Sequence, residues 1–385
     1  ECKGISDRKR QGGLVVTNLP QISTGQFVAV LLTSRLAVSL TFTPTLHQLS
    51  HGTDFLLSLL LQGGLLLLLL LPTMWFARRT GGISTLDYGF AAMGRVGGTG
   101  LAVFYGLVCL YVQTADLLRF SRFAASTLSP DMSRAVLCIV LMATAGVAAF
   151  YGVQAIARSA VVIAFFVVAC ILLSALALLP RMELINFPPL LYDGVSPVIA
   201  GALEELPRSM ELAAVGLLIP YVKGSVAKGC LWWCAGFTAV ALVIQATVVG
   251  VLGDFGTMEL YPYYAAVTTA QVSVLQRLDI VATAVWCGAL FLKTAFFGML
   301  FVECLQKVIG LRWRPLVAAA GSAAVLTAGL LFGGRLPLQT EQVMLWYSSA
   351  VLLGLCAVGI PLLFLCLDAR RRKHMPRPQG GEAVS

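Results

Sequence analysis

The chain of 385 residues is 58% hydrophobic and only 12% charged, whereas a soluble domain usually carries about a quarter charged residues. This composition excludes an ordinary soluble protein and predicts an all-α polytopic membrane protein. The formal net charge is +9, but the basic residues gather at the two ends and in short loops. That distribution is typical of orientation signals, and not of a surface that binds nucleic acid.

Ten apolar segments are each long enough to cross a bilayer as a helix. They cover about residues 22–42, 55–76, 100–120, 134–151, 155–179, 197–222, 226–252, 279–304, 315–332 and 343–367. We therefore expect three parts. Residues 1–20 form a polar, basic cytoplasmic arm, 21–368 form one ten-helix membrane domain, and 369–385 form a basic cytoplasmic tail.

Two of the connections have a recognisable character. The stretch 83–93 is amphipathic, which predicts a short helix at the membrane surface before the third span. The loop 253–276 contains Tyr261-Pro262-Tyr263-Tyr264, and we expect these aromatic rings to anchor the loop at the membrane interface.

An even number of spans places both ends of the chain on the same side of the membrane. The short loops on that side hold Lys223, Lys228, Lys307, Arg312 and Arg314, whereas the loops after the fifth, seventh and ninth spans are mainly acidic. The positive-inside rule therefore predicts that the N and C termini are cytoplasmic. Arg122 and Arg134 flank an outer turn against this rule, and short basic clusters of that kind are tolerated.

The sixth span carries Glu204, Glu205, Arg208 and Glu211 together with Pro207. Each charge at the centre of a bilayer costs roughly 2.5–3.5 kcal/mol on insertion scales, and proline removes a backbone donor. Such a segment persists only where it faces protein or a water-filled cavity. One interpretation is a kinked structural helix with an ion pair between Glu204 and Arg208. The other is a discontinuous helix that forms part of a small-ligand site near mid-membrane.

Ten spans with unusual first and sixth members favour a five-plus-five inverted repeat, a LeuT-like fold with broken helices 1 and 6. In such folds the ligand binds near the midplane, where these two helices are interrupted. The first span contains Arg35 and the run Ala37-Val38-Ser39 but has no glycine there. Its break is therefore less evident than that of the sixth span.

Lys293, inside the eighth span, is the other strong signal for function. Burial makes a lysine lose its proton readily unless a carboxylate accompanies it. Lys293 could replace a coupling cation, titrate as one, or simply neutralise the sixth span, a role in which Arg35 could share. Asp116, Arg119 and Glu303 lie near the predicted span ends, and we interpret them as interfacial or snorkelling groups.

The sequence carries no sign of catalysis or of metal binding. The three histidines, His47, His51 and His374, lie outside the spans, and no nucleophile–base spacing or phosphate loop is present. Most of the ten cysteines lie singly in apolar segments and are interpreted as buried thiols. Cys230 and Cys234 share a helix face without the further ligands that zinc needs. We expect no enzymatic activity, no cofactor and no metal.

Several short stretches occur in a characteristic order. They are Ile185-Asn186 through Pro189, Gly194-Val195-Ser196-Pro197, Met210-Glu211 before Ile219-Pro220-Tyr221-Val222-Lys223, Tyr261-Pro262, Gln276-Arg277-Leu278-Asp279, Val285-Trp286 and Phe291-Leu292-Lys293, with Leu118-Arg119-Phe120 and Pro130 in the first half. With these stretches the chain resembles the spore germination permease family, the B subunits of bacterial endospore nutrient-germinant receptors, over about residues 20–370. This family lies within the amino acid–polyamine–organocation transporter superfamily.

The resemblance implies a sensor. Such subunits lie in the spore inner membrane, recognise a small nutrient germinant together with A and C subunits, and trigger ion release and germination. An amino acid is the expected nutrient, and a cation-coupled amino acid permease is the alternative. The chain departs from the family at Ala37-Val38-Ser39, where a glycine is frequent, at Pro207-Arg208, and at Asp279, where glutamate is usual. These departures bear on the ligand class more than on the fold.

The resemblance also implies a ligand site lined by helices one, three, six and eight. At the matching positions its residues are Ala37, Val38, Ser39, Tyr105, Cys109, Arg208, Ser209, Met210, Glu211 and Lys293. Backbone donors freed at the break would bind a carboxylate. Glu211 would accept an ammonium group, or pair with Arg208 or Lys293. Tyr105 and Cys109 are four residues apart and form a pocket wall or pack without ligand contact.

Overall fold

The computed structural model describes residues 20–40, 52–128, 133–187, 189–192, 194–269, 278–333, 335 and 337–374. Nearly all of the predicted N-terminal arm lies outside these residues. So do residues 375–385 of the predicted tail and the Gln276-Arg277 part of the family pattern.

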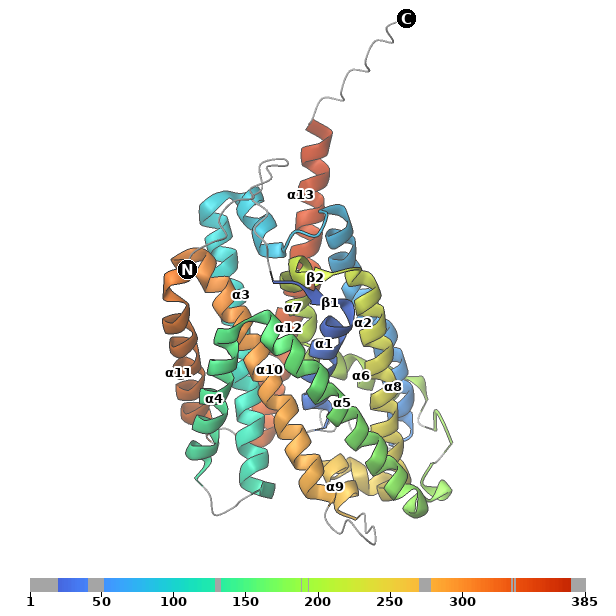
Figure 1. Cartoon of the computed structure of the whole chain (residues 1–385). Coiled ribbons are helices and arrows are strands. Elements are labelled where there is room, and N and C mark those ends of the chain that lie inside the picture. Colours follow the sequence, from blue (N-terminus) through green and yellow to red (C-terminus); the bar gives the residue numbers. More distant parts are fainter. Residues whose placement is uncertain are drawn as a thin grey trace, which may run out of the picture.

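Eight helical stretches among the described residues are long and apolar enough to cross a membrane. They are built from α2 (Asp54–Arg79), α3 (Thr85–Phe123), α4 (Arg134–Tyr151), α5 (Val153–Leu178), α8 (Val226–Leu252), α10 (Leu278–Ile309), α11 (Arg314–Phe332), and α12 (Leu338–Leu353) joined to α13 (Ile360–His374) through the π-helical η8 (Gly354–Gly359). They stand side by side as one bundle (Figure 1). The predicted all-α membrane protein is therefore confirmed, with eight such spans in the described part of the chain.

Helix α3 combines a surface segment with a span. Gly94 has φ 72° and interrupts the helical backbone, a conformation that glycine adopts without steric cost. The segment before this kink begins at Thr85, after Ser84 caps the helix by accepting a hydrogen bond from the Asp87 amide (3.0 Å). The predicted short helix at 83–93 is thus present as the first part of α3.

Helix α1 (Thr24–Ser39) has 16 residues, which corresponds to a length of about 24 Å. Ser23 and Gln26 form a capping box at its start. Just before this cap, β1 (Ile22–Ser23) pairs in parallel with β2 (Val222–Lys223), with Ile22 opposite Val222. The beginning of α1 is therefore joined to the segment that follows the sixth predicted span. No break interrupts α1 within these residues.

The sixth predicted span is discontinuous. Helix α6 (Val195–Glu205) runs into a 3₁₀ turn, η4 (Leu206–Arg208), and the chain resumes a helix only at α7 (Glu211–Leu218), which ends in η5 (Ile219–Tyr221). Pro207 lies in the turn, where its missing amide and fixed φ favour the end of an α-helix. The interpretation of this span as a broken helix is confirmed.

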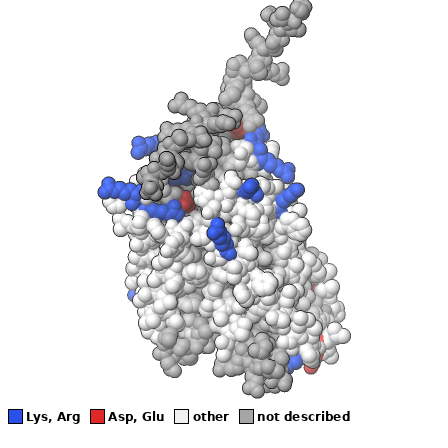
Figure 2. Space-filling view, viewed as in Figure 1, with Lys and Arg blue, Asp and Glu red and all other residues white. Residues whose placement is uncertain are grey.

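Helix α1 and the second half of the broken helix, α7, are buried in the bundle, whereas Val195, Ile199 and Leu203 of α6 are exposed. Helix α1 packs against α5, α8 and α10, and α10 packs against α3, α4 and α5. Both described ends of the chain lie at the same end of the bundle, where β1 begins and α13 emerges (Figure 1). On the face seen in Figure 2, the Lys and Arg side chains gather toward that end.

The aromatic loop differs from its prediction. After η6 (Gly253–Thr257), the short helix α9 (Pro262–Thr268) follows Tyr261. Tyr261 and Tyr263 are only 8% and 5% exposed. The Tyr261 ring lies 4.9 Å from that of Phe123, which itself contacts Trp286. The interpretation of these residues as an interfacial anchor was wrong for both tyrosines, because Tyr261 packs against Phe123 of α3 and Tyr263 is buried beside Cys170 and Ser174 of α5.

Candidate ligand site at the broken sixth helix

Four helices meet at the ammonium group of Lys293. Its Nζ lies 3.0 Å from Glu211 Oε1 at the start of α7 and 3.6 Å from Asp116 Oδ1 of α3. Ser34 of α1 donates a hydrogen bond to the same Glu211 oxygen (3.1 Å). All four side chains are at most 1% exposed. We call Ser34, Asp116, Glu211 and Lys293 the central cluster.

Arg119 balances the charge of the central cluster. Arg119 donates to Asp116 Oδ1 at 2.8 Å, so two carboxylates face two cations. Of the partners considered for Glu211 from the sequence, the structure selects Lys293. The interfacial interpretation of Asp116 was wrong, because this residue is fully buried beside Lys293. A signal was present, since Asp116 follows Cys109 by seven residues and so shares its helix face.

A second group of charges lies on the other side of the break, and we call it the outer cluster. Arg35 of α1 donates from Nη2 to Glu205 Oε2 at 2.8 Å. Arg208 Nη1 lies 2.7 Å from Glu205 Oε1, whereas its Nη2 is 3.9 Å from Glu204 Oε1. The ion pair between Glu204 and Arg208 that we inferred from the sequence is thus present, but it is longer than the contact between Arg208 and Glu205. The Arg35 guanidinium also lies over the Phe237 ring, 4.6 Å from its centroid.

Polar atoms around the break remain unsatisfied. Asp116 Oδ2, Glu211 Oε2, Arg35 Nε and Ser209 Oγ are buried and have no hydrogen-bond partner among the described residues. An unsatisfied buried group of this kind costs about 1–3 kcal/mol. The two carboxylate oxygens are acceptors, Arg35 Nε is a donor, and the Ser209 hydroxyl can act as either. The break therefore offers acceptors on one side and donors on the other.

The backbone at the break contributes less than expected. The Leu212 amide donates to Ser209 O and the Ala213 amide donates to Met210 O, both at 3.1 Å. The Ser209 amide donates to Leu206 O at 2.9 Å. These three amides are therefore engaged within the chain, whereas Arg35 Nε and the Ser209 hydroxyl are donors without a partner among the described residues.

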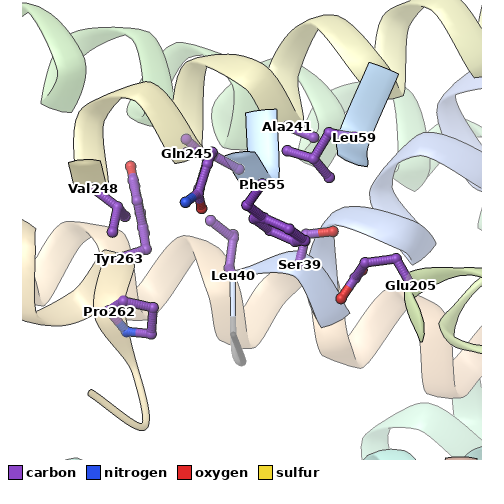
Figure 3. Close-up of a pocket in the computed structure, with 11 residues that line it drawn as sticks. Ser39, Leu40, Phe55, Leu59, Glu205, Ala241, Gln245, Val248, Pro262 and Tyr263 are labelled. Carbon is purple, nitrogen blue, oxygen red and sulfur yellow. The ribbon is translucent and has the colours of Figure 1, made fainter. Parts of the chain in front are cut away.

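A small cavity of about 40 Å³ lies next to the outer cluster. Figure 3 shows Ser39 and Glu205 toward one end of it and Gln245 and Tyr263 toward the other. Its volume has room for roughly three water molecules, which is less than an amino acid requires. Glu205, which lines the cavity, is the residue that Arg35 binds, so this ion pair lies at the edge of the cavity.

The three predicted residues of α1 lie at the end of that helix. The carbonyl of Ala37 accepts a hydrogen bond from Trp286 Nε1 of α10 (3.0 Å). Ser39 lines the cavity and accepts a hydrogen bond from Arg35 Nη1 (3.2 Å). Val38 is buried at 1% exposure. Ala37 and Ser39 thus connect α1 with α10 and with the outer cluster.

Tyr105 and Cys109 do not lie at the central cluster. They are buried beside Cys304 of α10 and Cys356 of η8, and the Cys109 and Cys304 thiols are hydrogen-bonded. Cys109 precedes Asp116 by seven residues, or about 10 Å along α3. In the described part of the chain, no group of three or more His, Cys, Asp or Glu side chains is placed to hold a metal ion.

A family model described as spore germination protein matches residues 21–332 of the chain. The matched range includes α1, the broken helix and all residues of the central and outer clusters. No curated protein matches the chain.

Proposed function

The chain belongs to the spore germination protein family, and we propose that it is the integral membrane subunit of a spore nutrient-germinant receptor. In this proposal it binds a small nutrient, an amino acid, near mid-membrane and triggers germination together with A and C subunits. It lies in the spore inner membrane, and the basic end of the bundle (Figure 2) faces the cytoplasm.

The proposed architecture has ten crossings. Helix α1 and the broken segment α6–η4–α7 would add two crossings to the eight long helical stretches. The two halves of five would then form an inverted repeat of the LeuT-like kind, with the ligand between the first and sixth members. The position of both described chain ends at one end of the bundle supports an even number of crossings.

One observation carries the choice of ligand, namely the four unsatisfied polar atoms at the break. An amino acid zwitterion carries an ammonium donor and a carboxylate acceptor. Asp116 Oδ2 and Glu211 Oε2 suit the ammonium, whereas Arg35 Nε and the Ser209 hydroxyl suit the carboxylate. Because the central cluster together with Arg119 is already neutral, a zwitterion adds no net charge to this buried site.

The proposed site includes the residues that surround the break. They are Ala37, Val38, Ser39, Arg208, Ser209, Met210, Glu211 and Lys293, to which we add Arg35 and Asp116. In this proposal the outer cluster lies between the site and the cavity of Figure 3, which Glu205 lines. Ligand entry therefore requires the pair of Arg35 and Glu205 to open.

Germination of the host tests this function. Spores that lack the chain are exposed to single amino acids and single sugars, and the loss of response to at least one amino acid is expected. The wild-type chain restores that response, whereas Ser209→Ala raises the amino acid concentration needed for it by tenfold or more, because a hydrogen bond to a charged group contributes roughly 1.5–3 kcal/mol. An unchanged response to every nutrient would contradict the proposal.

A cation-coupled amino acid permease is the second candidate, because Lys293 lies between two carboxylates where a coupling cation would bind. Uptake of labelled amino acids into proteoliposomes separates the two candidates. Saturable uptake by the isolated chain would favour the permease, and binding without uptake would favour the sensor.

A further inference from the structure

A groove of about 370 Å³ lies between α4 and α11, which stand next to each other in the bundle (Figure 1). Less than a third of the apolar stretch of each helix is buried, so this side of the bundle faces the membrane. We call it the α4–α11 groove. Small and apolar side chains line most of it, among them Ala143, Gly146 and Phe150 of α4 and Pro315, Ala319 and Ser322 of α11.

The α4–α11 groove extends over about half of the membrane thickness. Its lining runs from Met142 to Tyr151 on α4 and from Pro315 to Ser322 on α11, which corresponds to about 10–14 Å of helix. The hydrocarbon core of a bilayer is about 30 Å thick, so one leaflet contributes about 15 Å. Toward the other leaflet the exposed side chains of α4 include the larger Val136, Ile139 and Val140. The groove therefore has the length of an acyl chain in one leaflet, and it is too short for a helix that crosses the membrane.

The groove opens at the basic end of the bundle. Gln154, three residues after Tyr151, donates to Gln21 O just before β1 (3.3 Å). The Arg314 guanidinium lies beside Gly152, where a Cβ atom would come within 3.1 Å of Nη2. The mouth of the groove, at Tyr151 and Pro315, therefore lies at the end of the bundle toward which the Lys and Arg side chains of Figure 2 gather.

The charge at this mouth is positive. Arg314 Nη2 lies 3.3 Å from Glu303 Oε1, which compensates its charge. Arg312 is exposed and has no carboxylate partner among the described residues, and its guanidinium lies over the Trp313 ring, 6.0 Å from the centroid. Arg312 precedes Pro315 by three residues and so continues the face of the helix that lines the groove. The uncompensated cation at the mouth is therefore Arg312.

Two aromatic side chains flank the same mouth. Tyr151 is 70% exposed and Trp313 is 47% exposed. Tyr and Trp are enriched at the level of the lipid headgroups, which places the mouth at the membrane–water interface. A ligand that fits this groove has an apolar chain about one leaflet long and an anionic group at the interface.

We propose that the α4–α11 groove binds one acyl chain of an anionic phospholipid, whose phosphate is bound by Arg312. The lipid belongs to the leaflet at the basic end of the bundle. Its chain fills the groove beside Ala143 and Ala319, while its headgroup lies next to Tyr151 and Trp313. This site shares no residue with the central or outer cluster, and the proposal does not depend on the proposed function.

Lipid binding to the wild-type chain provides the first test. The full chain is freed of lipid in detergent, and its thermal unfolding midpoint is followed as phosphatidylglycerol or phosphatidylcholine with the same acyl chains is added. A ligand that binds the folded state raises the midpoint. A larger rise with phosphatidylglycerol is expected, because the uncompensated arginine favours an anionic headgroup. Equal rises with the two lipids would overturn the proposal.

Two substitutions test the headgroup contact and the groove separately. Arg312→Gln should weaken the binding of phosphatidylglycerol about fivefold, the change expected for one basic residue near a lipid surface, whereas Arg312→Lys should retain most of the affinity. Ala319→Phe fills the groove and should abolish the preference for phosphatidylglycerol over phosphatidylcholine. If either Arg312→Gln or Ala319→Phe leaves the titration unchanged, the assigned site is wrong.

Matched variants control for general effects of a ring or of charge. Ala320→Phe places the same ring on the next exposed position of α11, which is not among the residues that line the groove. Lys228→Gln removes an exposed basic residue at the start of α8. Both should bind phosphatidylglycerol as the wild type does, and a loss in either would contradict the assigned site.

A second copy of the chain is the other occupant that the experiment can detect. Size-exclusion chromatography of the delipidated protein is expected to give a monomer for both the wild type and Ala319→Phe. A wild-type dimer that Ala319→Phe converts into a monomer would show that the groove is a protein interface, and would overturn the lipid assignment.

Discussion

Ser34 and Arg35 are adjacent on α1, yet their side chains bind opposite sides of the break in the sixth helix. Ser34 donates to Glu211, the first residue of α7 (3.1 Å), and Arg35 donates to Glu205, the last residue of α6 (2.8 Å). The two contacts fix both half-helices relative to α1. The discontinuity is therefore held by a helix that precedes it by about 170 residues.

Loss of the Arg35 side chain should destabilise the protein strongly. In Arg35→Met, Glu205 retains only Arg208, and removal of one partner of a buried pair typically costs about 3–5 kcal/mol. Chemical denaturation of the purified chain measures this change. The matched control is Arg79→Met, whose partner Asp368 is partly exposed, and a loss of at most about 1 kcal/mol is expected there.

A second substitution separates charge from packing at this position. Adding Glu205→Leu to Arg35→Met removes the carboxylate that would otherwise lie uncompensated, so part of the lost stability should return. A double variant as unstable as Arg35→Met would show that the pair does not determine stability here.

Gly216 permits close packing between α7 and the start of α3. A Cβ atom at Gly216 would collide with the Thr85 hydroxyl oxygen, so Gly216→Ala should cost about 1–3 kcal/mol through overpacking. The Thr85 hydroxyl has no hydrogen-bond partner among the described residues. Adding Thr85→Ala should therefore recover most of the loss in the same denaturation measurement. Gly64→Ala, with no atom within 4 Å of the new Cβ, is the control.

Trp286 should influence the nutrient response through the end of α1. Its indole donates to Ala37 O (3.0 Å), while its ring packs on Phe123. Trp286→Phe keeps an aromatic ring but removes this hydrogen bond, at a cost of about 0.5–1.5 kcal/mol. Thermal unfolding should show the loss, and the dose–response curve of germination should shift to higher nutrient concentration. An unchanged curve would remove Ala37 from the proposed site.

Tyr105 should not affect ligand recognition. It lies with Cys109, Cys304 and Cys356, about two to three turns along α3 from the central cluster. Tyr105→Phe is therefore expected to leave the nutrient concentration for half-maximal germination unchanged, in contrast to Ser209→Ala in the same spores. A shift as large as that of Ser209→Ala would return Tyr105 to the ligand site.

Much of the membrane architecture could be predicted because hydrophobic length alone identifies a span. Pro207 and the charges around it also predicted the break, since both features are unfavourable inside a continuous membrane helix. The partnership of Glu211 with Lys293 was one of several alternatives, and only the packing of α7 against α10 decides among them.

Other features depend on contacts that a single sequence does not contain. The pair of Arg35 and Glu205 joins residues 170 positions apart. Asp116 follows an apolar run, so it was assigned to the end of a span, although α3 continues to Phe123 and buries it. Tyr261 and Tyr263 have the composition of an interfacial anchor, but neighbours from α3 and α5 bury them.

The short ladder between Ile22–Ser23 and Val222–Lys223 has a mechanical consequence. It connects the beginning of α1 to the segment that follows the broken helix, while Ser34 and Arg35 bind Glu211 and Glu205 on the two sides of the break. The two segments are thus connected by the β-ladder at one end and by the contacts of Ser34 and Arg35 near the middle of the membrane domain. A pull on the chain just before Ile22 is transmitted directly to the segment that leaves the break.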